Sequence, residues 1–399
     1  MERLRLAHKD LYNAALEERI GAYRKAKKSI SFNDQCISMT QIRKDDPDWR
    51  AINAQSAQVT LKRLDLAFQN FFRRVKQGKT PGFPRFQGKD HFKGFGFKTN
   101  GDGFKFEPGG GWRNGTLRLS GIGTMQVRGQ IRTNNGILCS GRIGGPVLGC
   151  SIVKRADGWY MSVVLDLEPA REGGDKSVGV DWGVETYLTC AYGAGDYDAV
   201  ENDRLWKQAA EEIKDRSRAL AKRKKRTRGR EKARRALARK WRKLANQRKD
   251  RAHKTSAWLV REHGLIATES LIISNMTRSA SGTSEEPGTN VAQKSGLNRE
   301  ILDTAPGSLL SMTKYKAEEA GVLLHVINSR KHKPSQSCPA CGCVKKKKLS
   351  ERQHICEDCG FEATRDQASA LFNLVIANRE LGPEWPSNIF SETPSIVAA

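Results

Sequence analysis

Cys338-Pro339-Ala340-Cys341 is one half of a paired motif, and Cys356-Glu357-Asp358-Cys359 is the other, with Thr364-Arg365-Asp366 close behind. Each pair places two thiolates on one tight turn, and a glycine follows each pair, at 342 and 360. Four sulfurs at this spacing can close a tetrahedral Zn²⁺ shell, which is usually structural. The predicted zinc ligands are therefore Cys338, Cys341, Cys356 and Cys359. Cys343 is an alternative ligand that we do not favour, and two disulfides are the weaker interpretation because no feature marks secretion.

Length and composition describe a globular chain of more than one domain. Its 399 residues allow two or three cores. No window approaches the ~20 consecutive apolar residues that a membrane span needs. Met1-Glu2-Arg3-Leu4 does not begin a signal peptide, and nine cysteines is an odd number that fits a reducing compartment. We expect a cytoplasmic protein without a membrane partner.

Charge is concentrated in one segment. The chain has 70 Lys and Arg against 44 Asp and Glu, and residues 204–254 alone hold 23 basic residues against five acids. Leu237, Trp241 and Leu244 recur there at helical spacing, so the segment predicts two basic amphipathic helices that turn near Thr227-Arg228-Gly229. A solvated linker is the alternative, but a polyanion, most simply nucleic acid, is the expected partner.

The pattern of apolar residues changes twice along the chain. Helical stripes at 12–23 and 61–75 predict packed helices whose apolar residues form a core, and Pro- and Gly-rich residues 78–86 end them. Short alternating runs up to about Pro169 then predict a β-rich module such as a small barrel. We expect a helical region at 1–80, a β-rich domain at 81–172, an α/β domain at 173–337 that resumes at 361–380, the zinc ribbon at 338–360, and a disordered tail at 381–399.

Three acids stand at special places in the α/β region. Asp181 follows Val178-Gly179-Val180 in a buried strand, Glu269 ends the strand 265–269, and Asp366 opens a helix. Burial of an unpaired carboxylate costs several kcal/mol, so acids at such places call for a reason. Taken singly, Asp181 and Glu269 could equally be turn or capping residues.

Together, the acids fit one kind of chemistry. Two carboxylates from strands of one sheet and one from a helix packed on it can hold two Mg²⁺ or Mn²⁺ ions, which prefer oxygen ligands and can activate water against a phosphodiester. Three acids on a βββαβα scaffold are the arrangement of RNase H-like nucleases. The fold predicted for this α+β multidomain chain is therefore an RNase H-like (RuvC-like) nuclease domain with an inserted zinc ribbon.

Four groups of residues resemble the TnpB proteins of bacterial insertion sequences, the relatives from which type V CRISPR effectors derive. The groups are Val180-Asp181-Trp182-Gly183, Thr268-Glu269-Ser270-Leu271, Ser335 to Gly342, and Arg365-Asp366-Gln367-Ala368. Gly82-Phe83-Pro84-Arg85-Phe86 is similar to the N-terminal half of that family. The resemblance extends from Leu11 to about Ala377.

The resemblance implies an RNA-guided DNA endonuclease that cuts beside a short adjacent motif at one RuvC-like site. A helical recognition lobe and a β-rich wedge barrel would hold a guide RNA, while Asp181, Glu269 and Asp366 would be the catalytic, metal-binding acids. The partners would be guide RNA and double-stranded target DNA, the chain would act as a monomer or a homodimer on RNA, and it would be nucleoid-associated in a prokaryote. The alternative is a guided DNA-binding repressor that does not cut.

Nucleic-acid contacts can be assigned to two sets of residues. Gln55 and Gln58 are candidates for reading the adjacent motif, because glutamine can bond adenine twice, although solvent-facing helix positions explain them equally well. Phosphate contacts are expected from Lys222, Arg223, Lys224, Lys225 and Arg226.

One alternative function and one departure from the family pattern also have to be considered. Gly179-x-Asp181-x-Gly183 could be the phosphate turn of an actin-like ATPase, but no later glycine-rich phosphate loop supports nucleotide hydrolysis. The sequence also lacks the N-terminal strand usual in the family, so the wedge barrel needs a substitute for it or has one strand fewer.

Overall fold

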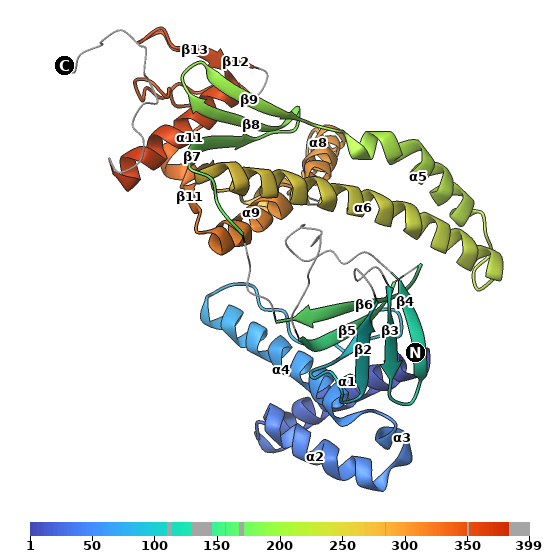
Figure 1. The fold of residues 1–399 in the computed structure, drawn as a ribbon. Coiled ribbons are helices and arrows are strands. Elements are labelled where there is room, and N and C mark those ends of the chain that lie inside the picture. The colour runs from blue at the N-terminus through green and yellow to red at the C-terminus, as the bar shows by residue number, and fades with distance from the viewer. Residues whose placement is uncertain are drawn as a thin grey trace. The chain divides into compact units, whose positions relative to one another are not determined.

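The computed structural model describes residues 1–109, 114–128, 146–155, 157–166, 171–283, 285–348 and 351–382. They form two compact units, one made of the described residues up to 166 and the other of those from 171 (Figure 1).

Helices begin the first unit. They are α1 (Glu2–Ala26), α2 (Phe32–Asp45), α3 (Pro47–Arg50) and α4 (Ala54–Lys76). Ser31 and Asp34 form a capping box that starts α2, and the Asn53 side chain caps α4. Leu16, Leu61 and Leu64 lie in the shared core, as expected from the stripes. The stripes do not stay in the core to their ends, because Tyr23 is 59% exposed and Val75 is 49% exposed.

Two antiparallel sheets follow in the same unit. One has the order β1 (Gly94–Phe97), β5 (Val147–Arg155), β6 (Gly158–Leu165), and the other has β2 (Phe104–Pro108), β3 (Asn114–Leu119), β4 (Gly123–Arg128). Their inward side chains, such as Phe95, Phe106 and Ile152, form a common core. Met1 and Leu4 of α1 pack against that core, so a helix contributes apolar surface to the two sheets.

A mixed five-stranded sheet organises the second unit. Its strands are β7 (Lys176–Trp182), β8 (Thr186–Gly193), β9 (Asp196–Glu201), β10 (His263–Glu269) and β11 (Leu323–Ile327), in the order β11-β10-β7-β8-β9. β7, β8 and β9 are antiparallel, whereas β10 runs parallel to both β7 and β11. Since both faces are covered by helices, Val178 to Asp181 are buried without interruption.

Helices cover the two faces differently. α6 (Arg228–Glu262) and α9 (Pro306–Ala320) share the core on one face, and α11 (Arg365–Leu381) packs on the other. A Cβ at Gly179 would lie 2.0 Å from the carbonyl oxygen of Ala370, so only glycine allows α11 to come this close. Side chains alternate along a strand, so Asp181, two residues on, faces the same helix.

The basic segment is a long helical hairpin. α5 (Leu205–Ala221) packs against α6 through Leu205, Ile213 and Leu244, and the chain turns between them at residues 222–227. Asp303, at the end of α8 (Val291–Thr304), bonds both helices of the hairpin. The Asp303 carboxylate accepts the backbone N–H of Trp206 in α5 at 2.9 Å and pairs with Arg248 in α6 at 2.7 Å. Two basic helices were predicted, and the turn lies immediately before the predicted position.

Small elements complete the unit. α7 (Ile273–Met276) and α10 (Ser329–His332) are single turns, and β12 (Gln353–Ile355) pairs with β13 (Glu362–Thr364). These two strands stand on either side of the second cysteine pair. Leu381 still belongs to α11, and the rest of the predicted tail beyond Gly382 lies outside the described residues. No helix in the described ranges is long and apolar enough to cross a membrane.

Candidate functional site

Three elements bring the predicted acids to one end of the sheet. Asp181 is the last residue but one of β7 and Glu269 is the last of β10, and these parallel neighbours end at the same edge. Asp366 is the second residue of α11, which packs across them, and its Oδ2 lies 3.7 Å from the position of a Cβ built on Gly183. Residues separated by almost half of the chain thus meet.

Burial and mutual repulsion set the protonation of these acids. Asp181 is only 8% exposed, and its pKa is raised well above the usual value by burial and by the charges of Glu269 and Asp366. Burial also raises the pKa of Glu269. A carboxylate that other carboxylates push toward the neutral form gains most from a nearby cation.

Two serines that the sequence did not single out support the acids. The Ser369 hydroxyl donates to Asp181 Oδ1 at 3.1 Å, and Ser329 bonds the Glu269 carboxylate; both contacts lower the pKa of the acid they touch. Ser369 follows Asp366 by three residues and so shares its helix face, which was a usable signal. Ser329 had none, since it reaches β10 only through the parallel pairing of β10 and β11.

The acids fit divalent cations in donor type. All three offer oxygen, the ligand of Mg²⁺ and Mn²⁺. Their carboxylates are not gathered as closely as the cysteines: within the described ranges, only the four cysteines form a group of three or more ligand side chains whose donor atoms all lie within 4.8 Å of one another.

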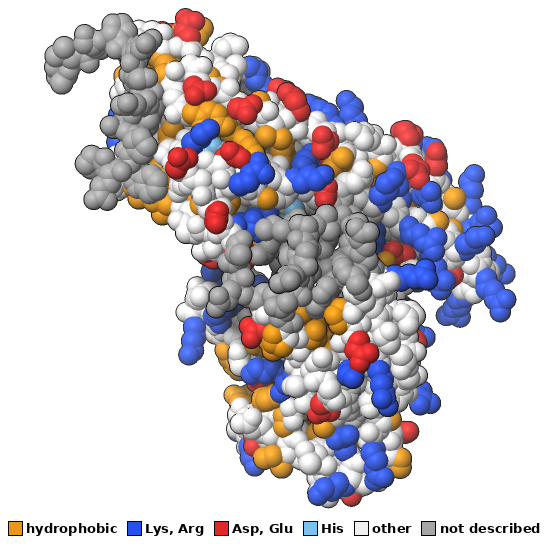
Figure 2. Space-filling model, viewed as in Figure 1, with side chains coloured by type: hydrophobic (Ala, Val, Ile, Leu, Met, Phe, Trp, Pro, Cys, Tyr) orange, Lys and Arg blue, Asp and Glu red, His pale blue; other side chains and the backbone are white. Residues whose placement is uncertain are grey.

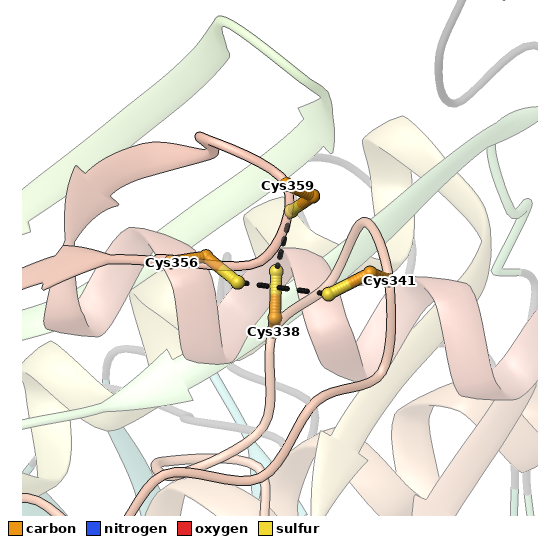
Figure 3. Close-up of side chains that lie close together, drawn as sticks. All are labelled: Cys338, Cys341, Cys356 and Cys359. Atoms are coloured by element: carbon orange, nitrogen blue, oxygen red, sulfur yellow. Dashed lines mark hydrogen bonds between the residues drawn. The ribbon is translucent and has the colours of Figure 1, made fainter. Parts of the chain in front are cut away.

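The four cysteine sulfurs converge on one point (Figure 3). Sγ atoms of Cys338 and Cys359 are 3.6 Å apart, as are those of Cys341 and Cys356. Tetrahedral zinc with Zn–S bonds of about 2.3 Å requires sulfur separations of this size. The cluster therefore suggests a structural zinc ion, as the spacing predicted.

Backbone geometry shapes both turns of the cluster and lowers the pKa of one of its thiols. Gly342 and Gly360 have φ of 80° and 72°, which lets each turn fold back on its cysteines. Burial would raise the pKa of Cys356, but N–H groups of Cys359 and Asp358, together with neighbouring thiols, bring it down to about 7. Cys343 stays outside the cluster; its thiol lies beside Asp358, which raises its pKa to about 11.

The predicted phosphate contacts lie at the tip of the α5–α6 hairpin. Residues 222–226 are all exposed, and among the described residues none of these five side chains has a carboxylate within 4.0 Å. Figure 2 shows Lys and Arg side chains gathered over this hairpin. Glu212 of α5 pairs with Lys240 of α6, and Arg216 of α5 donates to the carbonyl oxygen of Ala236 in α6, so polar contacts join the two helices that carry the tip.

The two glutamines have structural partners. Gln55 Oε1 accepts the backbone N–H of Thr99 at 3.2 Å, and Gln58 Oε1 accepts the Lys98 ammonium at 2.9 Å. Both side chains thus tie α4 to the end of β1. Paired bonding to adenine needs the amide oxygen as well as the amide nitrogen, so these contacts would have to break first.

Comparison with known proteins identifies two regions of similarity. Residues 160–280 match a family described as "Probable transposase" (OrfB_IS605), and residues 307–372 match the TNB domain of Cas12f1-like proteins. The first region includes Asp181 and Glu269, and the second includes the four cysteines and Asp366.

Whole-chain relatives agree with these regions. The chain is 29% identical over 331 residues to an Escherichia coli (strain K12) protein provisionally named RNA-guided DNA endonuclease InsQ, covering 82% of this chain and 74% of the relative. A Streptomyces pristinaespiralis protein with a provisional name of the same kind is 26% identical, covering 92% and 82%. These matches confirm the resemblance to the TnpB family.

The fold also has a solved counterpart. A protein in a complex of Cas12f1 with guide RNA and target DNA superposes with a TM-score of 0.57 at 15% identity, covering 94% of this chain and 81% of that one. The chain therefore shares the mixed α/β fold of these compact effectors.

Proposed function

We propose that this chain, as a relative of the TnpB proteins, is an RNA-guided DNA endonuclease that cuts target DNA beside a short adjacent motif. The cut would be made by two-metal phosphodiester hydrolysis at one RuvC-like site formed by Asp181, Glu269 and Asp366. The observation that carries the proposal is the meeting of these three acids at one edge of the sheet, where Glu269 and Asp366 raise the pKa of Asp181.

Strand order supports the nuclease fold. β7, β8 and β9 are followed by helices, β10, more helices and β11, and α11 closes the opposite face. This is the βββαβα succession on which RNase H-like nucleases place their acids. β10 and β7 are adjacent and parallel, which explains why acids 88 residues apart in sequence share one edge.

Side chains of this site would hold the cations and keep the acids charged. Bound Mg²⁺ or Mn²⁺ ions would supply Lewis-acid activation of the attacking water and stabilise the leaving oxygen. Asp181 would bind only after losing its proton, and Ser369 eases this loss by donating to Oδ1. Ser329 does the same for Glu269. Asp366 lies in the first turn of α11, where the helix N-terminus favours a negative charge.

Nucleic acid would be held by charge and shape. The exposed cations at 222–226 would contact phosphates, positioning RNA or DNA without reading its sequence. Guide pairing would read the target, as in other RNA-guided nucleases. Gln55 and Gln58 remain candidates for reading the adjacent motif only if their bonds to residues 98 and 99 open. The zinc ribbon would shape the end of the site ahead of Asp366 and take no part in the chemistry.

Guided binding without cutting is the alternative function. A repressor gains nothing from buried carboxylates that destabilise one another, so the raised pKa of Asp181 disfavours it.

The test uses the chain with the RNA that co-purifies from its native genomic context. That RNA is sequenced, and the complex is incubated with matching DNA targets that carry randomised flanks. Cutting beside one flank that requires Mg²⁺ or Mn²⁺ and is lost in Asp181→Ala supports the proposal. Target occupancy without cutting would establish the repressor, and absence of a discrete RNA would refute guidance.

A further inference from the structure

A cavity of about 570 Å³ lies at the opposite edge of the same sheet. It is lined by Ser177 at the start of β7, Tyr192 at the end of β8 and His263 at the start of β10, whereas the nuclease acids are at the far ends of β7 and β10. Four residues of extended strand separate Ser177 from Asp181, roughly 13 Å. The cavity has the size of a small-molecule site and is distinct from the proposed nuclease centre.

Polar groups on the cavity lining have no protein partner. Both amide atoms of Asn378 and the hydroxyl of Ser177 are shielded from solvent, and no described residue hydrogen-bonds them. Buried donors and acceptors are nearly always satisfied, so unpaired groups on the lining of a cavity indicate a ligand or ordered water there. The carboxamide offers one acceptor and two donors, and the hydroxyl offers both.

The charge of this cavity is opposite to that of the chain. Asp196, Asp198 and Glu262 line it, and among the described residues Lys176 is the only Lys or Arg on the lining, in a protein whose net charge is +26. Within the described part of the chain, neither Asp196 nor Asp198 has a cation within 4.0 Å, and Glu262 pairs only with the exposed Arg261. Figure 2 shows acidic side chains over the region of β8 and β9, apart from the Lys- and Arg-rich hairpin.

The acids of the lining act on Tyr192. The pKa of Tyr192 is raised to about 12 by burial, and the charges of Asp198, Asp196 and Glu262 act on the same hydroxyl. His263, stacked on Tyr192 at 5.7 Å, has a pKa lowered by burial, so it adds no positive charge at neutral pH. A phosphate would be repelled from this place, which rules it out as part of the nucleic-acid surface.

An aromatic wall adds a second preference. Trp258 and Tyr192 both line the cavity, and both pack on His263. Aromatic faces attract ammonium groups and also cover the methylene chains between them. Carboxylates on two elements, β9 and the end of α6, match more than one positive charge at separate points.

We propose that this cavity binds a linear aliphatic polyamine. Its ammonium groups would pair with Asp196, Asp198 and Glu262, and its methylene chain would lie along Trp258 and Tyr192. The unpaired amide oxygen of Asn378 would accept an N–H once this side chain turns toward the cavity. A monoamine would fill one of these positions only and so bind less tightly.

Calorimetric titration of spermidine into the full chain, freed of nucleic acid and in about 0.15 M salt to screen loose surface attraction, tests the proposal. We expect saturable binding at one site. Asp196→Asn/Asp198→Asn should weaken it by about tenfold or more, since two charge-assisted hydrogen bonds are lost. Both aspartates are exposed, so this variant is expected to fold, and its thermal transition verifies that.

A matched control separates the site from general charge. Glu211→Gln/Asp215→Asn removes two exposed acids from α5 and should leave spermidine binding unchanged. Equal weakening in both double variants would mean attraction to the surface alone and would overturn the proposal. Equal affinity for butylamine would overturn the polyamine assignment, and so would the absence of binding to the wild-type chain. Asn378→Ala, with every charge retained, should weaken binding severalfold.

Discussion

The zinc ribbon and the carboxylate edge are both clusters of ligand side chains, but they are assembled in different ways. Four cysteines within 22 residues converge through two local turns, with sulfur pairs 3.6 Å apart. The acids come from β7, β10 and α11 and meet only because the five-stranded sheet has formed. The cysteines are drawn together closely, whereas the acids repel one another and raise the pKa of Asp181.

The two clusters therefore depend on the rest of the fold to different extents. A cluster made by local turns can be completed by its metal with little help from the rest of the chain. A cluster made by a sheet is held in place by the core, even though its like charges oppose that arrangement. The zinc cluster is expected to depend mainly on its own ligands. The carboxylate cluster is expected to destabilise the folded protein.

The largest expected effect comes from the sheet-borne cluster. Asp181→Asn keeps the shape of the side chain but removes the charge that would bind cations, so cutting should fall by at least about 10³-fold. RNA binding should be unchanged, since the RNA contacts proposed above are the cations at 222–226 and not this acid. Cleavage assays and RNA-binding titrations would check both. Glu318→Gln, an exposed acid on α9, should behave as wild type; undiminished cutting by Asp181→Asn would exclude this site.

Removal of one ribbon ligand should have a local effect. Cys356→Ser should reduce bound zinc from about one ion per chain to almost none, because three thiolates bind far less tightly than four. The main core of the sheet contains no ribbon residue, so the principal thermal transition should persist. Metal analysis and calorimetry would measure both quantities. Cys343→Ser, outside the cluster, should keep its zinc; a loss there would mean that the ligand set is wrong.

The basic hairpin tip should act through charge alone. Replacing Lys222, Lys224 and Lys225 with Gln should weaken RNA binding about tenfold near 0.1 M salt and lower the slope of log affinity against log salt by up to about 0.7 for each lost phosphate contact. Replacing the same three residues with Arg keeps the charge and should preserve affinity. Salt titrations of binding decide the matter: an equal loss in both variants would indicate a structural role.

A smaller effect is expected from Ser369→Ala. Loss of the hydrogen bond to Asp181 Oδ1 should raise the pKa of that acid further. The pH profile of cutting should then move to higher pH, and Mn²⁺ affinity should fall severalfold. Ser217→Ala is a matched control, because the Ser217 hydroxyl donates to the carbonyl oxygen of Ile213 within the same helix. A uniform loss of activity with an unmoved pH profile would argue against a positioning role.

The smallest effect concerns stability against pH. The pKa of Asp181 is raised on folding from an ordinary 3.8, so the folded chain keeps this proton to higher pH than the unfolded chain. In the presence of a chelator, the contribution of Asp181 to folding stability is therefore greatest below pH 3.8. This contribution is lost as the pH rises through the raised pKa of the acid. Asp181→Asn should remove that loss, raising the melting temperature at pH 8 by about 1–2 °C.

Added Mg²⁺ provides the control for this pH effect. It should stabilise the wild-type chain at pH 8 but not Asp181→Asn, because the cation binds the charged acid. Identical pH profiles of the two proteins in chelator would show that the charge of Asp181 carries no cost.

Local features could be predicted from sequence more fully than assembled ones. The cysteine cluster, the basic helices and the acid positions at strand ends follow from spacing and periodicity. Exposure of Tyr23 and Val75 could not be predicted, because a stripe shows which face is apolar and not how much of its length finds a partner.

By itself the sequence determined which residues can bind zinc, which segment carries positive charge, and which three acids stand at element ends, since these depend on residue type and near neighbours. Only the tertiary structure decided that Ser369 and Ser329 support two of the acids, that Gln55 and Gln58 are bonded to residues 98 and 99, and that an acidic cavity lies at the other edge of the sheet. The reason is physical: such contacts join residues far apart in the chain, and strand register and helix packing bring them within bonding distance.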